Sequence, residues 1–288
     1  MLVCSYPILQ VRPYGLLVYD HKEYDSRLKK STTRKTGKIN QYSGELTPFA
    51  KKKLKRAIGL MVASAKEKEA INFKTGKMFK FKINFITLTL PSQQGSIEDK
   101  AIKHCLDNFI KRCRRKHKLV SYVWRAERQA NGSIHFHIIT DVYIHYEKIR
   151  NDWNECLRPT GLIDKFKEKH GHENPNSTDV HAIWKVKNLT QYFVKYMSKK
   201  RKEKEEPIKG KVWDCSTNLK TKENCSMLLE GTIRENFDTL YKRLDIDRID
   251  DPNFAILFIR QENWEMLLCK EIKTQWELYL EKIRCSKE

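Results

Sequence analysis

Two histidines separated by one residue lie in the segment Gly132-Ser-Ile-His-Phe-His-Ile-Ile-Thr140. Successive side chains of a strand point to opposite faces, so His135 and His137 share one face and the intervening apolar residues share the other. Two imidazoles at adjacent positions on one face form a ready pair of metal ligands. A second such pair, His170 and His172, flanks a glycine and precedes a polar run, so we expect it in a loop without a strand to hold it.

A carboxylate can join the first histidine pair if the preceding hairpin has the right register. The connection Ala130-Asn-Gly132 is a strong hairpin signal. A two-residue Asn-Gly loop would set Glu127 opposite Phe136, on the wrong face. A three-residue loop with its glycine in the left-handed conformation sets Glu127 opposite His135 instead. We favour the longer loop, which gives a two-histidine, one-carboxylate site for a divalent ion with open positions. The alternative is that Glu127 is a salt-bridged surface residue. We call Glu127, His135 and His137 the ligand cluster.

A helix carrying two tyrosines is predicted between Asn188 and Lys200, with Asn188 as its cap. Three apolar residues at helical spacing form its expected buried stripe: Leu189, Phe193 and Met197. At about 100° per residue, four reactive side chains fall together in the sector beside that stripe. They are Tyr192, Lys195, Tyr196 and Lys199. Tyrosines four residues apart are often packing residues, but two lysines in the same sector are harder to explain by packing.

The order of these motifs resembles that of a known enzyme superfamily. A strand with Phe85-Ile-Thr-Leu-Thr-Leu90, then His-Phe-His, then Tyr-x-x-x-Tyr on a helix is similar to the three motifs of HUH endonucleases. Within them, the chain resembles the two-tyrosine rolling-circle replication initiators of microviruses and bacterial plasmids. The resemblance covers roughly residues 80–216 and includes the closing segment Gly210–Ser216. It implies a central antiparallel sheet of about five strands, of the ferredoxin-like type.

The resemblance also implies a reaction, the nicking of single-stranded or hairpin origin DNA. Tyr196 or Tyr192 would attack the phosphodiester, form a covalent 5′-phosphotyrosine and later allow the strand to be rejoined. We expect Tyr196 to be the stronger nucleophile. Mg²⁺ or Mn²⁺ in the ligand cluster would polarise the phosphate, and Lys195 or Lys199 would favour the tyrosinate or neutralise phosphate charge. A host helicase and a host polymerase are the expected protein partners.

Three other classes of function stay open from the sequence. A two-tyrosine transposase of the same superfamily would carry the same motifs. A non-catalytic module could bind single-stranded DNA or RNA by stacking bases on aromatic residues of a basic sheet. A metal hydrolase could use the histidine pair to activate water, with tyrosines that only pack. A covalent adduct between protein and DNA would separate the first class and the initiator from the last two.

The charge of the chain points to a polyanionic partner. Its 288 residues carry a net charge of +21, yet residues 230–288 hold 10 basic and 13 acidic side chains. A basic body with a near-neutral tail is typical of proteins that bind nucleic acid through the body. There is no apolar run of 18 residues and no signal-peptide pattern, so we expect a protein of the bacterial or phage-host cytoplasm, without membrane association. The 8 cysteines contain no Cys-x-x-Cys pair, which favours reduced thiols over a zinc ribbon.

The remaining pattern predicts an α+β fold. We expect helices near residues 47–65, 96–117 and 146–157, and strands at 77–90 and 178–186. Residues 1–45 are polar and lysine-rich. The expected divisions are a basic N-terminal segment and helix that pack on the catalytic domain (1–80), the endonuclease domain (81–216), and a C-terminal extension with a strand and an amphipathic helix (217–288).

Overall fold

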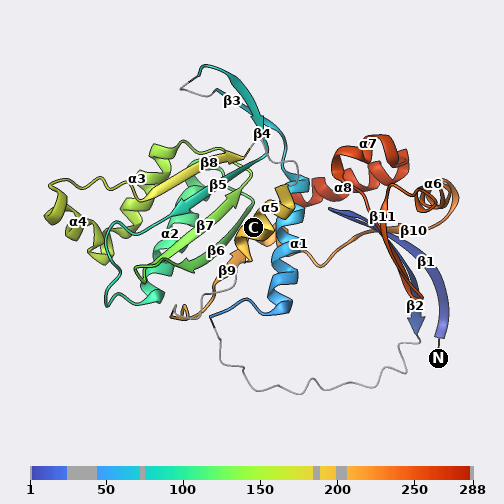
Figure 1. Cartoon of the computed structure of the whole chain (residues 1–288), viewed down its shortest axis with the longest axis horizontal. Helices are drawn as coiled ribbons and strands as arrows, with labels where there is room; N and C mark the ends of the chain where they lie inside the picture. Colours follow the sequence, from blue (N-terminus) through green and yellow to red (C-terminus); the bar gives the residue numbers. More distant parts are fainter. Residues whose placement is uncertain (1, 25–43, 72–74, 184–188, 199–205, 286–288) are drawn as a thin grey trace. The chain divides into compact units, whose positions relative to one another are not determined.

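The computed structural model describes residues 2–24, 44–71, 75–183, 189–198 and 206–285 (Figure 1). The chain divides into two compact units. The larger unit is Gln41–Lys220, and the smaller unit combines Met1–Asn40 with Thr221–Cys285. Both units consist of a five-stranded antiparallel sheet with helices, so the α+β class is confirmed.

The sheet of the larger unit carries the histidine strand next to its centre. In spatial order its strands are β8 (Thr178–Ile183), β5 (Ile83–Leu88), β7 (Ile134–Thr140), β6 (Tyr122–Arg128) and β9 (Trp213–Cys215). The strand predicted at 77–90 is two strands, β4 (Met78–Phe81) and β5; β4 pairs with β3 (Lys68–Ile71) in a separate two-stranded sheet. The antiparallel five-stranded sheet is as predicted, and its ferredoxin-like topology stays a prediction.

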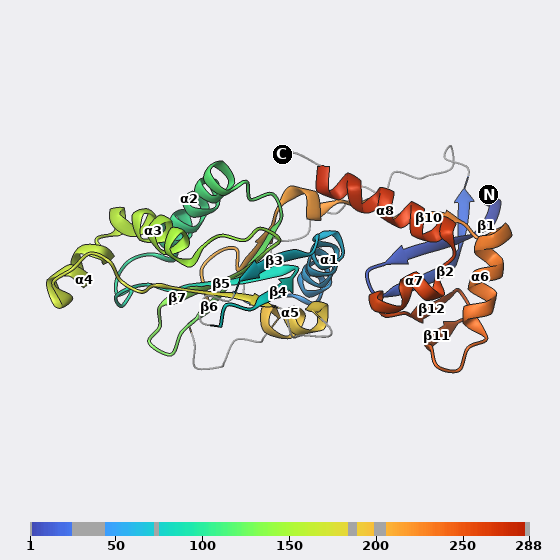
Figure 2. The same ribbon diagram turned by 90° about the horizontal axis from the view of Figure 1, so that it is seen from above.

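Helices cover both faces of this sheet (Figure 2). One face packs on α2 (Asp99–His117) and α3 (Tyr146–Leu157), where the Trp153 ring lies 6.1 Å from Phe136 of the sheet and 5.8 Å from Phe109 of α2. The opposite face packs on α5 (Leu189–Met197), which in turn contacts α1 (Pro48–Ser64). The remaining helical segments of this unit are η2 (Arg158–Thr160), α4 (Leu162–His170) and η3 (Thr217–Lys220). Among the described residues, no helix is both long and apolar enough to cross a membrane.

The local signals at the start of α1 act as predicted. Thr47 Oγ1 accepts a hydrogen bond from the backbone N–H of Ala50 at 3.1 Å, which satisfies one of the free donors of the first turn. Pro48 occupies the first turn, where its missing N–H costs nothing. Leu54 and Ile58 are buried at helical spacing, so the helix presents an apolar face to the unit.

The smaller unit joins the two ends of the chain in one sheet. Its strands, in spatial order, are β10 (Cys225–Leu228), β1 (Leu2–Arg12), β2 (Gly15–Tyr24), β12 (Phe254–Phe258) and β11 (Asp247–Asp251). Its helical segments are α6 (Gly231–Tyr241), η4 (Gln261–Asn263), α7 (Trp264–Leu267) and α8 (Lys270–Cys285).

This arrangement differs from the expected division at residues 80 and 216, because the first forty residues group with the C-terminal region. The polar, lysine-rich reading of residues 1–45 overlooked two long strands. Leu9 and Leu16 are fully buried, and they pair with Val18 and Leu257, so alternate apolar residues of β1 and β2 face the core of this unit.

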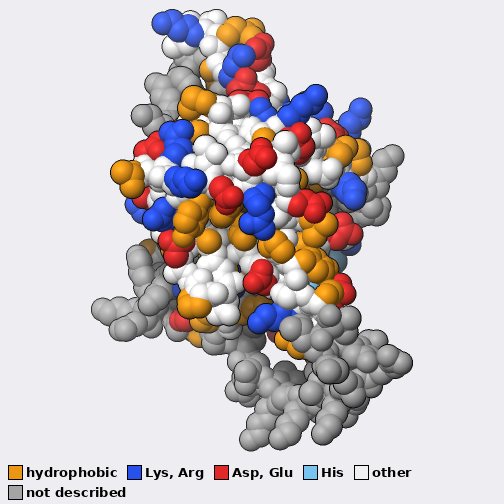
Figure 3. All heavy atoms as spheres, turned by 90° about the vertical axis from the view of Figure 1, so that its right-hand side faces the viewer, with side chains coloured by type: hydrophobic (Ala, Val, Ile, Leu, Met, Phe, Trp, Pro, Cys, Tyr) orange, Lys and Arg blue, Asp and Glu red, His pale blue; other side chains and the backbone are white. Residues whose placement is uncertain are grey.

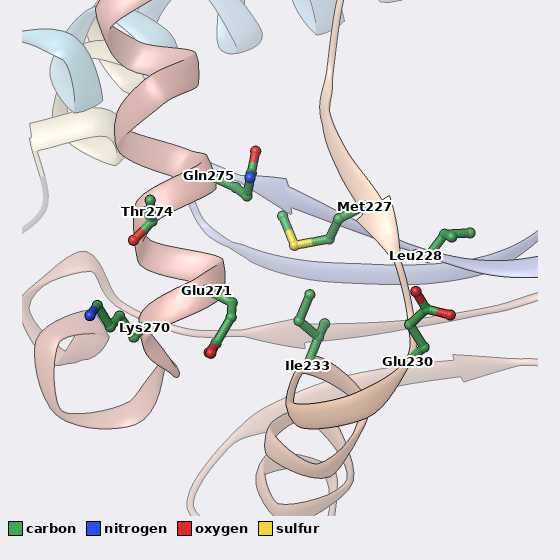
Figure 4. A pocket seen from close by; sticks show the side chains of 8 residues that line it. All are labelled: Met227, Leu228, Glu230, Ile233, Lys270, Glu271, Thr274 and Gln275. Carbon is green, nitrogen blue, oxygen red and sulfur yellow. The ribbon is translucent and has the colours of Figure 1, made fainter.

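The positive charge of the chain belongs to the larger unit. Residues 41–220 contain 38 Lys and Arg against 19 Asp and Glu, whereas the rest of the chain contains 19 against 17. Figure 3 shows one face of the smaller unit, with acidic and basic side chains interspersed among apolar ones. A shallow groove of about 570 Å³ in this unit lies between β10, α6 and α8 (Figure 4). Its lining mixes apolar and polar side chains: Met227, Leu228, Glu230, Ile233, Lys270, Glu271, Thr274 and Gln275.

Candidate functional site

The hairpin between β6 and β7 sets the register of the ligand cluster. Gln129 N–H donates to Ser133 O at 2.8 Å, which leaves a three-residue loop, Ala130–Gly132, between them. Gly132 has φ +81°, a left-handed conformation that strains any residue with a Cβ. Glu127 consequently lies directly opposite His135, so the predicted three-residue loop is confirmed and the two-residue alternative is wrong.

The three side chains of the ligand cluster converge on one small volume. The Nε2 atoms of His135 and His137 lie 3.0 Å apart, and Glu127 Oε2 lies 3.7 and 3.6 Å from them. Three atoms at these separations share a point about 2.0 Å from each, which matches the bond lengths of Zn²⁺ and Mg²⁺ to nitrogen and oxygen ligands. The cluster could therefore hold a metal ion.

The protonation of Glu127 suits the same role. Burial raises the pKa of Glu127, but the hydrogen bonds and charges of His135 and His137 outweigh burial and lower it to about 2. The side chain is thus an ionised, anionic ligand at neutral pH. Among the described residues, Glu127 Oε1 and His135 Nδ1 are buried and have no hydrogen-bond partner. An uncompensated buried carboxylate oxygen is costly, and a bound cation would offset that cost.

Strand β5 holds the second histidine of the cluster from two sides. Thr87 lies opposite His137 in the sheet, and its Oγ1 is 3.2 Å from His137 Nδ1. The Phe85 ring stacks on the His137 ring, with centroids 5.2 Å apart and an interplanar angle of 28°. The alternating strand containing both residues was visible in the sequence, but its pairing with the histidine strand was not. Thr87 and Phe85 therefore did not enter the predicted site.

The tyrosine helix α5 meets the same face of the sheet through Phe85. Its Phe193 is fully buried, and the Phe193 ring stacks on Phe85 with centroids 6.0 Å apart. The Tyr196 ring makes an edge contact with Phe85 at 6.2 Å, and the Tyr192 ring lies 4.8 Å from Tyr196. One phenylalanine thus touches both His137 of the ligand cluster and Tyr196 of the helix.

The two tyrosines differ in their surroundings. The Tyr196 side chain is 36% exposed. Burial raises the pKa of Tyr192, and the charge and hydroxyl of Tyr196 raise it further. The Tyr192 hydroxyl is consequently harder to ionise than an ordinary tyrosine. Lys195, on the same helix, is exposed, and Lys199 and Asn188 lie outside the described residues.

A buried polar network anchors the hairpin that carries the cluster. The Asp99 carboxylate accepts from the Arg128 guanidinium at 2.8 Å, from Gln94 Nε2 at 2.9 Å and from the backbone N–H of Lys209 at 2.8 Å. Gln94 Oε1 in turn accepts from the backbone N–H of Ile134 at 3.0 Å. Arg128 and Ile134 follow Glu127 and precede His135 in the chain, so this network fixes the backbone beside two of the three ligands. Nothing in the local sequence pattern indicated it.

Comparison with protein families gives one match. A family model for the replication-associated protein ORF2 matches residues 83–201, a segment that runs from β5 to just beyond α5. This segment contains the whole ligand cluster and both tyrosines. The match is consistent with a rolling-circle replication initiator. No curated protein and no solved structure matches the chain significantly.

Proposed function

We propose that the protein is a replication initiator that nicks single-stranded or hairpin origin DNA by tyrosine attack and later rejoins the strand. The observation that carries this proposal is the contact of Phe85 with both His137 and Tyr196, since it relates a potential metal site to a potential nucleophile on one sheet face. The family match over residues 83–201 supports a role in replication, rather than the transposase alternative.

Phosphodiester cleavage by tyrosine needs help at both reacting groups. A tyrosine hydroxyl has a pKa near 10, so about one in a thousand is ionised at pH 7, which is a deficit of about 4 kcal/mol. A divalent cation bound by the ligand cluster, which we propose to be Mg²⁺ or Mn²⁺, supplies Lewis-acid polarisation of the phosphate. Lys195 and Lys199 are proposed to offset the charge of the tyrosinate or the phosphate.

We assign the first attack to Tyr196. Its side chain is exposed and contacts Phe85, whereas burial and the neighbouring tyrosine raise the pKa of Tyr192. In the step, the Tyr196 oxygen loses its proton and bonds to phosphorus, and the bond from phosphorus to the 3′ oxygen breaks. The products are a 5′-phosphotyrosine and a strand with a free 3′-OH, which a host polymerase with a host helicase would extend. Tyr192 then attacks the regenerated junction while Tyr196 still holds DNA.

The larger unit is the proposed DNA-binding body. It carries twice as many basic as acidic residues, while the rest of the chain is nearly neutral. Each neutralised phosphate releases counterions, so binding should weaken steeply with salt.

The test is to trap the covalent adduct. Wild-type protein is incubated with a single-stranded origin oligonucleotide labelled at its 3′ end and Mn²⁺, and the products are separated under denaturing conditions. We expect label attached to protein in the wild type and none in the double variant Tyr192→Phe/Tyr196→Phe. Cleavage without adduct, unchanged in the double variant, would establish the metal hydrolase instead. DNA binding without cleavage would establish the non-catalytic module.

A further inference from the structure

The two histidines of the ligand cluster are held differently. His137 Nδ1 lies 3.2 Å from the Thr87 hydroxyl, while His135 Nδ1 is buried without a hydrogen-bond partner among the described residues. We propose that Thr87 is a positioning residue that keeps His137 in the tautomer required of a metal ligand. The inference rests on the metal site of the proposed function.

The argument begins with the proton inventory of a neutral imidazole. One ring nitrogen carries a proton and the other offers a lone pair, and only the lone pair can bind a cation. His137 Nε2 faces Glu127 Oε2 at 3.6 Å, so this nitrogen must be the unprotonated one for the cluster to bind metal. A hydrogen bond from His137 Nδ1–H to Thr87 Oγ1 places the proton on the far nitrogen.

The contact between the two histidines requires the same assignment. Their Nε2 atoms lie 3.0 Å apart, a distance that needs a proton on one of them and a lone pair on the other. With its Nδ1 proton held by Thr87, His137 supplies the lone pair and His135 supplies the proton. His135 has no partner that opposes a change of tautomer, so it can release that proton when a cation enters the cluster.

Strand β5 is suited to hold this contact rigidly. Thr87 and His137 are direct cross-strand partners, so their backbone positions are fixed by the sheet ladder. Threonine is branched at Cβ, which restricts the rotation that would move its hydroxyl away. Phe85, two residues earlier on the same face, stacks on the imidazole and opposes its rotation.

Three variants separate the hydroxyl from the rest of the side chain. Thr87→Val keeps the shape and β-branching but removes the hydroxyl, and Thr87→Ser keeps the hydroxyl. Thr89→Val is the matched control, because the Thr89 hydroxyl donates to Ser177 O at 3.0 Å, away from the cluster. Mn²⁺ affinity is measured by calorimetry on the full chain, and thermal melts check that each variant folds. We expect Thr87→Val to weaken Mn²⁺ binding by about 10- to 100-fold, and the other two variants to bind within about threefold of wild type. Wild-type affinity in a folded Thr87→Val variant would overturn the proposal.

A second measurement does not depend on metal. Nitrogen NMR of the metal-free protein distinguishes the two histidine tautomers through the shifts of their ring nitrogens. We expect the Nδ1–H form at His137 in wild type and Thr89→Val, and its loss in Thr87→Val without change at His135's neighbours. If wild type binds no Mn²⁺ yet shows this pattern, the metal site fails and the positioning role of Thr87 stands. If wild-type His137 is the Nε2–H form, the proposal about Thr87 fails whatever the metal result.

Discussion

Replacing Asp99 with asparagine should loosen the hairpin that carries the ligand cluster. The Asp99 side chain is 5% exposed and the Arg128 side chain is 9% exposed, with 2.8 Å between Asp99 Oδ2 and Arg128 Nη2. The same oxygen accepts from Lys209 N–H, and the other oxygen accepts from Gln94 Nε2. Every group that faces this carboxylate in these three contacts is therefore a hydrogen-bond donor.

The magnitude follows from that donor set. Asparagine keeps the size of the side chain but turns one acceptor oxygen into a donor, so at least one of the surrounding donors loses its acceptor. The buried Arg128 guanidinium also loses its counter-charge, and breaking a buried pair from one side costs about 3–5 kcal/mol. Because Gln94 Oε1 accepts from Ile134 N–H, the loss reaches the first residue of the histidine strand.

Hydrogen exchange followed by mass spectrometry measures this cost locally, on peptides covering residues 122–140. We expect Asp99→Asn to speed exchange in these peptides by about 100- to 3,000-fold, since each 1.4 kcal/mol of opening free energy is a factor of ten. Asp107→Asn is the matched control, because it lies on the same helix and is exposed; it should change stability by less than about 0.5 kcal/mol. An Asp99→Asn effect no larger than that of the control would show that Arg128 does not depend on this carboxylate.

Three further outcomes test the site and its surroundings. Mn²⁺ at about a hundred times its dissociation constant should stabilise the wild type by about 2.7 kcal/mol; His135→Ala or His137→Ala should abolish both this gain and nicking while the far-ultraviolet circular dichroism stays unchanged, and near wild-type nicking in either variant would mean that the metal ligands are misassigned. Tyr192→Phe and Tyr196→Phe should each retain some cleavage, with the Tyr196 variant slower, and neither should rejoin DNA; normal repeated rejoining by one variant would make the missing hydroxyl a packing group. A fragment of residues 41–220 should keep the salt slope of DNA binding shown by the full chain, because it holds nearly all the excess positive charge; a much shallower slope in a folded fragment would place the smaller unit in the DNA site.

Features set by local geometry could be predicted from the sequence. The position of Glu127 depends on the parity of a single loop, and Gly132 decides that parity because few other residues tolerate φ +81°. The cap of α1 at Thr47 and the buried stripe of α5 at Phe193 likewise depend on residues within a few positions of one another. Each of these predictions used a short-range rule with few alternatives.

Features that depend on distant pairing could not be predicted. Ile8 pairs with Leu228, and no local pattern in β1 indicates a partner so far along the chain. The polar residues of the first forty positions concealed strands whose apolar faces are completed only by the C-terminal region. The contact between Thr87 and His137 was hidden for the same reason, since it depends on which strand lies beside β7.

The two halves of the candidate site are therefore independent in origin, although one side chain touches both. The ligand cluster is formed within one hairpin and is anchored by Asp99 and Gln94. The tyrosine helix is placed by burial of Phe193 and by its stacking on Phe85, without any contact that passes through Glu127 or His135. Loss of the metal should then leave the tyrosines in position, and loss of the hydroxyls should leave metal affinity unchanged. Metal affinity and adduct yield consequently report on separate parts of the site, and Phe85 is the residue through which a defect in one part would reach the other.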